Sequence, residues 1–242
     1  MNRAFQKGFL AIDFPAAPFR SPLTVLLRSA SVFFGNFPFI AAVTLAVFLP
    51  VKAAIQLLCW MFDVSTNSLT MYLLLDLSDL VLASLVTPAV IYALVARFRG
   101  DPAPPIAEAL RWGRRQWGKT LWNKFKVEVT IMLWGALLVI PGLVAMVKLI
   151  FTDQIVAIEG DRESEVLQRS RDITEGRRWL IFSVVLPVLI VELAGTYFIL
   201  KAFQGSEYSR PLLAIVDSVL SVGGQWTNVV ALLMYLGLTR ER

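Results

Sequence analysis

The sequence predicts an all-α protein of the membrane: a polytopic helical bundle with about six transmembrane helices and further helices at the membrane interface. The chain of 242 residues is 57% hydrophobic, has a mean hydropathy of +0.65 and carries only 17% charged residues. Soluble proteins have roughly 45–50% apolar and about 25% charged residues. Several apolar stretches also approach the roughly 20 residues that cross a bilayer as a helix, with every backbone group paired internally. We interpret residues 1–242 as a single transmembrane domain.

The first two predicted spans follow an interfacial N-terminal segment, residues 1–36. The spans cover residues 37–62 and 70–96, and the short connection between them contains no lysine or arginine. Residues 97–120, by contrast, contain several of both. Because positively charged segments stay on the cytoplasmic side, we expect 97–120 to be cytoplasmic, and with it the N-terminus.

Pro141 and Gly142 decide the number of spans that we predict. One long helix through this region would place the arginine-rich residues 159–178 outside, against the charge rule. Proline interrupts a helix and glycine permits a reversal, so we expect a tight outer turn at this pair. The third and fourth spans are then 121–140 and 143–158, and 159–178 is a cytoplasmic segment. The remaining predicted spans are 179–200 and 211–238. Both termini are then cytoplasmic, in what we expect to be a bacterial inner membrane.

Six ionisable side chains lie inside the predicted spans and away from the cytoplasmic ends of those spans. Such residues are costly in lipid and usually face other helices or a wet cavity. With a rise of about 1.5 Å per residue, all six come to lie in the outer half of the bilayer, so we predict that they converge there. Two interpretations remain open: ion pairs that fix the helix register, or a vestibule for a solute or an ion. The six residues are Lys52, Asp76, Asp79, Lys148, Glu192 and Asp217.

The segment 106–122 combines tryptophans with cations. Tryptophan favours the headgroup region of a bilayer and cations favour anionic lipid, so we predict a helix that lies on the inner leaflet. The alternative is an ordinary solvated linker helix. The predicted headgroup contacts are Arg111, Trp112, Arg114, Arg115, Trp117 and Lys119.

The composition argues against an enzyme. The chain has no histidine and a single cysteine, Cys59. The commonest general base is therefore absent, and so is the usual ligand set for zinc or haem. No phosphate-binding loop or nucleophile-elbow motif is present. We expect no catalytic residues, no metal and no cofactor. We interpret the net charge of +5 as cytoplasmic lysine and arginine, with no nucleic-acid partner.

Two stretches resemble a known family. The first reads Leu-Leu-Val-Ile-Pro-Gly-Leu-Val-Ala-Met-Val-Lys over residues 137–148. The second reads Ile-Val-Ala-Ile-Glu-Gly over 155–160 and continues as Arg-Ser-Arg-Asp-Ile-Thr-Glu-Gly-Arg-Arg-Trp over 169–179. Together they resemble the membrane domain found beside some bacterial glycerophosphodiester phosphodiesterases, and related uncharacterised six-span membrane proteins. The matching residues are Pro141, Gly142, Glu159, Gly160, Arg169, Ser170, Gly176 and Trp179.

The resemblance implies a helical hairpin at Pro141 and Gly142. It also implies that no catalytic residue belongs to this domain, because in that family the fused phosphodiesterase carries the chemistry. Finally, it suggests that Glu159 and Arg169 brace a cytoplasmic helix, predicted at 161–175, against neighbouring spans.

Two classes of function follow from these observations. The first is a non-enzymatic membrane protein that acts as a scaffold, an accessory subunit or a lipid-interacting subunit. Its partners would be anionic membrane lipids, a second copy of the chain or another membrane protein. The alternative is a transporter or channel-like protein that uses the charged residues of the outer half as its vestibule.

Overall fold

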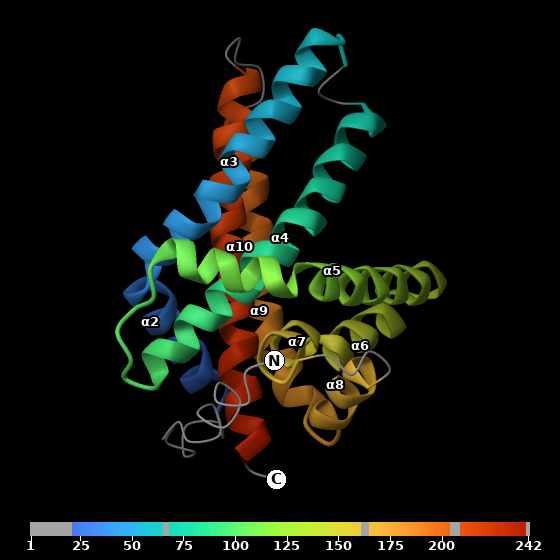
Figure 1. Cartoon of the computed structure of the whole chain (residues 1–242). Coiled ribbons are helices and arrows are strands. Elements are labelled where there is room, and N and C mark those ends of the chain that lie inside the picture. Colours follow the sequence, from blue (N-terminus) through green and yellow to red (C-terminus); the bar gives the residue numbers. More distant parts are fainter. Residues whose placement is uncertain (1–20, 65–67, 161–164, 204–208, 241–242) are drawn as a thin grey trace.

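Helices make up all of the regular secondary structure in the part of the chain that the structure describes. The computed structural model describes residues 21–64, 68–160, 165–203 and 209–240. The longest upright helices are α3 (Phe37–Met61), α4 (Leu69–Phe98), α9 (Arg178–Phe203) and α10 (Ser209–Arg240). They run along the length of the molecule (Figure 1). The predicted all-α bundle is confirmed.

The described residues contain five stretches that are long and apolar enough to cross a membrane, judged by length and composition. The chain is therefore a multi-pass membrane protein. The five stretches are Phe37–Met61, Leu69–Phe98, Val139–Ile158, Arg178–Ile199 and Leu212–Thr239.

The two ends of the bundle differ in how they are packed. The end of α3, the start of α4 and the end of α9 lie at the upper end in Figure 1. These segments contain exposed large apolar residues, such as Trp60, Leu73 and Phe198. At the lower end, further helices surround the same four helices (Figure 1). The segments of α4 and α10 that reach this end contain almost completely buried residues, such as Ile91 and Leu232. We call these the open end and the packed end. Exposed apolar side chains at the open end are what lipid contact requires.

Helix α5 (Ile106–Leu137) contradicts the predicted third span. It is one continuous 32-residue helix, so the expected boundary between the segment 97–120 and the span 121–140 does not exist. It lies across the upright helices rather than beside them (Figure 1), and it packs most extensively against α4. A Cβ on Gly113 would collide with the carbonyl oxygen of Leu85, so only glycine permits this close crossing. Gly118 does not end the helix, because one interior glycine costs only about 1 kcal/mol.

The chain does reverse after α5, but earlier than predicted. The break is at Leu138, whose backbone is extended, and Pro141 and Gly142 lie in the first turn of α6 (Val139–Leu149). Proline is tolerated there because a first-turn residue needs no intrahelical donor. Gly142 instead allows close packing: a Cβ on it would lie 2.9 Å from the Cα of Gly135 on α5.

The predicted fourth span, 143–158, is also divided. It comprises the end of α6 and the short helix α7 (Thr152–Ile158), which are separated by a break at Ile150 and Phe151. Both helices lie at the packed end beside α8 (Val166–Thr174) (Figure 1). A helix of 11 residues is only about 16 Å long, so only α6 and α7 together, as the stretch Val139–Ile158, are long enough to cross a bilayer.

The remaining described elements close the packed end. Helix α2 (Pro22–Gly35) begins with proline, which the first turn of a helix tolerates, and packs against α10. The indole nitrogen of Trp226 on α10 donates a hydrogen bond of 3.1 Å to the hydroxyl of Ser29, which is fully buried. The rest of the predicted N-terminal interfacial segment, residues 1–20, lies outside the described residues. So do residues 161–164 of the predicted cytoplasmic helix, whose described part is α8.

Candidate functional site

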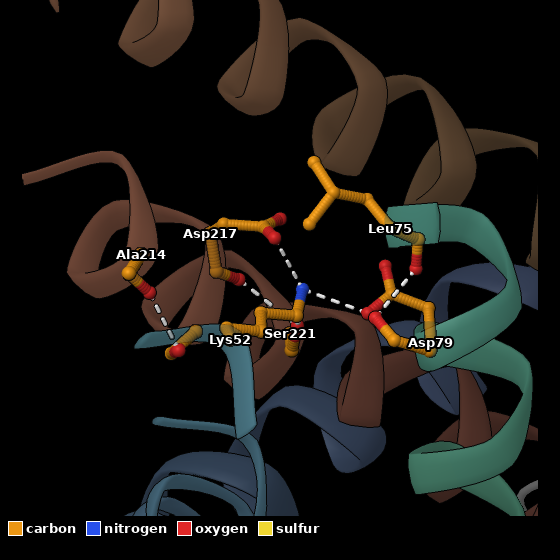
Figure 2. Close-up of polar contacts among 8 residues, drawn as sticks. Lys52, Leu75, Asp79, Ala214, Asp217 and Ser221 are labelled. Atoms are coloured by element: carbon orange, nitrogen blue, oxygen red, sulfur yellow. Dashed lines mark hydrogen bonds and ion pairs between the residues drawn. The ribbon is translucent and has the colours of Figure 1, made fainter. Parts of the chain in front are cut away.

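A buried lysine joins three of the upright helices near the open end. The ammonium nitrogen of Lys52 on α3 lies 2.7 Å from Oδ1 of Asp79 on α4 and 2.5 Å from Oδ2 of Asp217 on α10. It also donates a hydrogen bond of 3.1 Å to the hydroxyl of Ser221. Figure 2 shows the lysine between the two carboxylates. An ammonium group has three N–H donors, and here each has an acceptor. We call these four residues the Lys52 cluster.

The burial of the cluster indicates why the pairing matters. The side chain of Lys52 is fully buried, whereas Asp79 and Asp217 are 43% and 29% exposed. A buried unpaired ammonium would be strongly unfavourable, and two nearby carboxylates offset that cost. The cluster carries one excess negative charge. This charge lies on the two aspartates, which are partly exposed.

The structure brings together only part of the predicted six-residue cluster. Asp76 lies three residues before Asp79 and is exposed, so it stands at the edge of the Lys52 cluster. Glu192 is elsewhere: it accepts a 2.9 Å hydrogen bond from Thr227, ten residues beyond Asp217 on α10 and therefore about 15 Å away. The prediction of a single outer cluster is wrong for Glu192, because its bond to Thr227 places it well below Asp217. It is also wrong for Lys148, because α6 does not run upright beside α3 and α10 (Figure 1).

A second polar layer lies below the Lys52 cluster. The side-chain amide of Asn228 donates hydrogen bonds to Gln225 at 3.1 Å and to Thr87 on α4 at 3.4 Å. Thr44, Thr87 and Gln225 each lie eight residues from Lys52, Asp79 and Asp217 in the direction of the packed end, which is about 12 Å along a helix. All three are buried. We call Thr44, Thr87, Gln225 and Asn228 the Asn228 layer.

A small cavity adjoins this layer. It has a volume of about 170 Å³ and lies between α5, α6, α7, α9 and α10. Thr227 and Asn228 line one side, and Lys124, Glu128 and Asp153 line another. Lys124 and Asp153 form an ion pair at 2.6 Å. We call this cavity, with its lining residues, the α5–α10 cavity.

The predicted headgroup residues are divided between the two faces of α5. Arg111, Arg114, Arg115 and Lys119 are exposed. The two tryptophans instead contact α4: Trp112 stacks on Tyr92 with ring centroids 5.1 Å apart, and Trp117 donates a 3.1 Å hydrogen bond to the carbonyl of Val81. The tryptophans therefore fix α5 on the bundle, and the cations remain on its outer face.

The outer face of α5 changes character along its length. Beyond Lys119 it presents Trp122 and Phe125, which stack with centroids 6.0 Å apart, and Lys126 lies 5.0 Å from the Trp122 ring centroid. It continues into exposed apolar residues at the end of the α5–α6 hairpin. These are Met132, Leu133, Trp134, Leu137, Leu138, Val139 and Ile140. We call these seven residues the hairpin tip.

A larger cavity lies where this hairpin meets α8 and the start of α9. Its volume is about 440 Å³. Cations line it from three elements: Lys148 on α6, Arg171 on α8 and Arg178 on α9. Apolar lining comes from Trp134, Pro141, Val144, Ala145 and Leu149, and the remaining lining residues are Thr130, Gln168, Asp172 and Glu175. We call it the α6–α8 cavity.

The residues that carry the resemblance described above hold this region together. The hydroxyl of Ser170 donates to the carbonyl of Lys148 at 2.9 Å and accepts from the amide of Phe151 at 3.3 Å, so it spans the break between α6 and α7. Glu159 pairs with Arg169 at 3.5 Å and accepts a hydrogen bond from the hydroxyl of Tyr235 on α10. These bonds match the predicted brace by Glu159 and Arg169.

The motif glycines and tryptophan have simpler roles. Gly160 and Gly176 have φ angles of +74° and +76°, which other residues rarely adopt. They end α7 and follow α8, respectively. Trp179 is 84% exposed at the start of α9, a position that suits a tryptophan at a membrane–water interface.

Sequence reasoning missed the polar residues below Lys52. The signal was present, because Asp217, Ser221 and Gln225 recur every four residues and Asn228 follows three later, a spacing that places them on one helix face. Ser221, Gln225 and Asn228 were overlooked because they carry no charge. Among the described residues, no group of three or more histidine, cysteine, aspartate or glutamate side chains is arranged to hold a metal ion.

Comparisons with known proteins identify no relative of this chain. No family model matches it, and no curated protein or solved structure shows significant similarity. The resemblance to the membrane domain of the glycerophosphodiester phosphodiesterase type therefore stays a prediction.

Proposed function

We propose that this chain is a non-enzymatic membrane protein that binds anionic phospholipid at its packed end, through the α6–α8 cavity. The observation that carries the proposal is the combination of three cations and an apolar wall in one cavity. Lys148, Arg171 and Arg178 approach it from three different helices. A phosphate group is the ligand that such a set of cations favours.

The surroundings of the cavity match the rest of a lipid molecule. Trp134 and Val144 belong to its lining, and the exposed hairpin tip continues the apolar surface from Trp134. Acyl chains need an apolar path that begins beside the phosphate site, and the hairpin tip offers one. Asp172 and Glu175 also line the cavity, so its net charge is modestly positive: three cations and two carboxylates leave an excess of one cation.

The outer face of α5 supports a position of the packed end at the headgroup region of the bilayer. Its exposed cations, Arg111, Arg114, Arg115 and Lys119, precede the stacked Trp122 and Phe125. A helix with cations followed by aromatic and apolar residues on one face suits the boundary between headgroups and acyl chains. We infer that α5 lies along the inner surface of the bilayer and that the upright helices cross it above α5.

Native mass spectrometry of the full chain tests the proposal. The protein is purified in mild detergent and mixed with phosphatidylglycerol or phosphatidylcholine. We expect bound phosphatidylglycerol, and we expect the double variant Arg171→Gln, Arg178→Gln to lose about tenfold in affinity, equivalent to about 1.4 kcal/mol. The matched control is Lys201→Gln, which removes an exposed cation from the other end of α9.

The outcomes are distinct. Equal retention of phosphatidylglycerol by the double variant and by the control would disprove the cavity as the lipid site. Equal retention of the two lipids by the wild-type chain would disprove a preference for anionic headgroups. Competition by glycerol phosphate without an acyl chain would show that a soluble phosphate ester, and not a lipid, is the ligand.

A further inference from the structure

We propose that the open end binds a transmembrane helix of another membrane protein, and that this helix carries a lysine or arginine at the depth of Asp76 and Asp79. The inference is independent of lipid binding at the α6–α8 cavity, which lies at the packed end. It rests on carboxylates that lie inside the candidate spans with acceptor atoms to spare, on an exposed face of α4, and on the excess negative charge beside that face.

Three carboxylates of the open end lie well inside candidate membrane spans. Asp76 and Asp79 are seven and ten residues after Leu69, the first residue of α4, which is about 10 Å and about 15 Å along the helix. Asp217 is five residues after Leu212, where the candidate span of α10 begins, or about 8 Å along it. A carboxylate at such a depth is costly in lipid and usually faces protein or water. The open end therefore needs a further polar neighbour.

Lys52 neutralises only part of this charge. Its three N–H donors bond to Asp79, Asp217 and Ser221. Each of the two aspartates uses one oxygen for the ammonium, and the other oxygen has no hydrogen bond to a described residue. Asp76 is exposed and has no ion-pair partner among the described residues. Three carboxylates and one ammonium leave two excess negative charges, which favour a cation.

A buried acceptor on α3 also has no donor. Gln56 is four residues from Lys52 on the same face of α3, about 6 Å closer to the open end. Its side chain is 4% exposed, and its carbonyl oxygen accepts no hydrogen bond from a described residue. Carboxylate oxygens and a carbonyl oxygen that lie within two turns of each other suit a cation with several N–H donors. An ammonium and a guanidinium group are such cations.

The surface around Asp76 favours a helix as the carrier of that cation. Leu69, Tyr72 and Leu73 are 73%, 55% and 58% exposed. With Asp76 they occupy positions i, i+3, i+4 and i+7, so they form one face of α4, and this is the spacing at which one helix contacts another. The first turns of α4 stand apart from the other upright helices (Figure 1). An apolar helix with one basic residue would cover the three apolar side chains and also reach the carboxylates.

A second copy of this chain does not supply the cation. Among the basic residues of the four upright helices, only Lys52, Lys201 and Arg210 lie toward the open end. Lys52 is fully buried and already paired. Lys201 and Arg210 are within two residues of the ends of α9 and α10, so their charges belong near the membrane surface. The partner is therefore a different protein.

Energy transfer in vesicles tests this surface. The full chain is reconstituted into vesicles of phosphatidylglycerol and phosphatidylethanolamine with a synthetic leucine–alanine helix of about 23 residues. The peptide carries a dansyl group at one end and a single arginine about eight residues, or about 12 Å, from that end. Trp60, which is 64% exposed at the open end, is the nearest donor for the dansyl group. We expect at least about tenfold tighter binding than for the same peptide with glutamine in place of arginine, equivalent to about 1.4 kcal/mol.

Variants of the chain identify the carboxylates. Asp76→Asn should weaken the preference for the arginine peptide. The double variant Asp76→Asn, Asp79→Asn should abolish it, because Lys52 and Asp217 then neutralise each other; Lys52 still has Asp217 and Ser221 as acceptors. The matched control is Asp63→Asn, which should leave the preference unchanged. It removes an exposed carboxylate that follows α3 at the open end, outside the helices, at a φ of +50° that asparagine tolerates.

The possible results separate the occupants of this surface. Equal binding of the arginine and glutamine peptides to the wild-type chain would overturn the proposal. So would a double variant that keeps its wild-type elution volume and still prefers the arginine peptide. If the double variant does not fold, Asp76→Asn decides, and an unchanged preference refutes the proposal.

Two further results would replace the proposed partner with another occupant. Displacement of the peptide by an equal concentration of ethylguanidinium would show that a small cation, and not a helix, is the ligand. A wild-type dimer in native mass spectrometry that Asp76→Asn dissociates would show that a second copy covers the face of α4. Either result would overturn the helix of a different protein as the partner.

Discussion

Gly142 faces Gly135 across the α5–α6 hairpin, and no side-chain atom of either residue separates the two backbones. A Cβ on Gly142 would lie 2.9 Å from the Cα and 3.1 Å from the nitrogen of Gly135. The two helices are therefore in contact through their backbones at this point. The direction of α6, and with it the position of Lys148 at the α6–α8 cavity, depends on that contact.

Substitution of Gly142 by leucine should destabilise the hairpin. The new side chain meets backbone atoms, which cannot move aside, so we expect a loss of about 1–3 kcal/mol, typical of an overpacked interior. Thermal unfolding in detergent measures the change. Gly118→Ala is the control, since no atom outside its own helix lies within 4 Å of the place that the alanine Cβ would take and alanine favours a helix by up to about 1 kcal/mol. A Gly142→Leu protein as stable as Gly118→Ala would contradict the close contact.

Substitution of Lys52 by methionine should destabilise the upright helices. It leaves Asp79 and Asp217 facing each other without a cation. Removal of one partner from a fully buried ion pair costs about 3–5 kcal/mol, but both aspartates are partly exposed, so we expect about 1–3 kcal/mol. Unfolding in detergent measures the loss.

A triple variant provides the control for Lys52. Adding Asp79→Asn and Asp217→Asn to Lys52→Met removes all three charges, so most of the lost stability should return. If the triple variant is no more stable than Lys52→Met alone, unpaired charge is not the cause of the loss.

Substitution of Ser170 by alanine should loosen the connection between α6 and α7. The change removes the partner of both the Lys148 carbonyl and the Phe151 amide, and Ser170 is fully buried. Buried backbone groups without a partner cost about 1–3 kcal/mol, and hydrogen exchange at Phe151 should become faster. Ser183→Ala removes an exposed hydroxyl that bonds within its own helix and should leave both stability and exchange unchanged. Unaltered exchange at Phe151 would contradict the role of Ser170.

The sequence was sufficient to predict the fold class, because a segment in lipid has to pair all of its backbone hydrogen-bonding groups internally. Stretches such as 37–62 and 70–96 are predominantly apolar, so each is expected to be a helix in lipid, and each corresponds closely to one observed helix. Lys52 and Asp79 could be matched in depth from the helical rise alone, since α3 and α4 are consecutive. Their contact needed no knowledge of the remaining helices.

The sequence was insufficient where the chain leaves the upright bundle. Residues 121–140 are apolar enough to suggest a span, but they continue a helix whose first half is cationic and packs across α4 through Gly113. A long-range contact of this kind has no local sequence signal. The charge rule predicted a fourth span at 143–158, which lies within the candidate stretch Val139–Ile158, but this helical region does not run beside α3 and α10, so Lys148 does not join the Lys52 cluster.

Ser221, which shares the ammonium of Lys52, is synthesised 169 positions later in the chain. A nascent polypeptide that has inserted only α3 and α4 can pair Lys52 with Asp79, but two of the three ammonium donors lack their acceptors until the ribosome has delivered α10. The last helix has to enter beside the first ones, and a truncated product leaves those two donors unbonded.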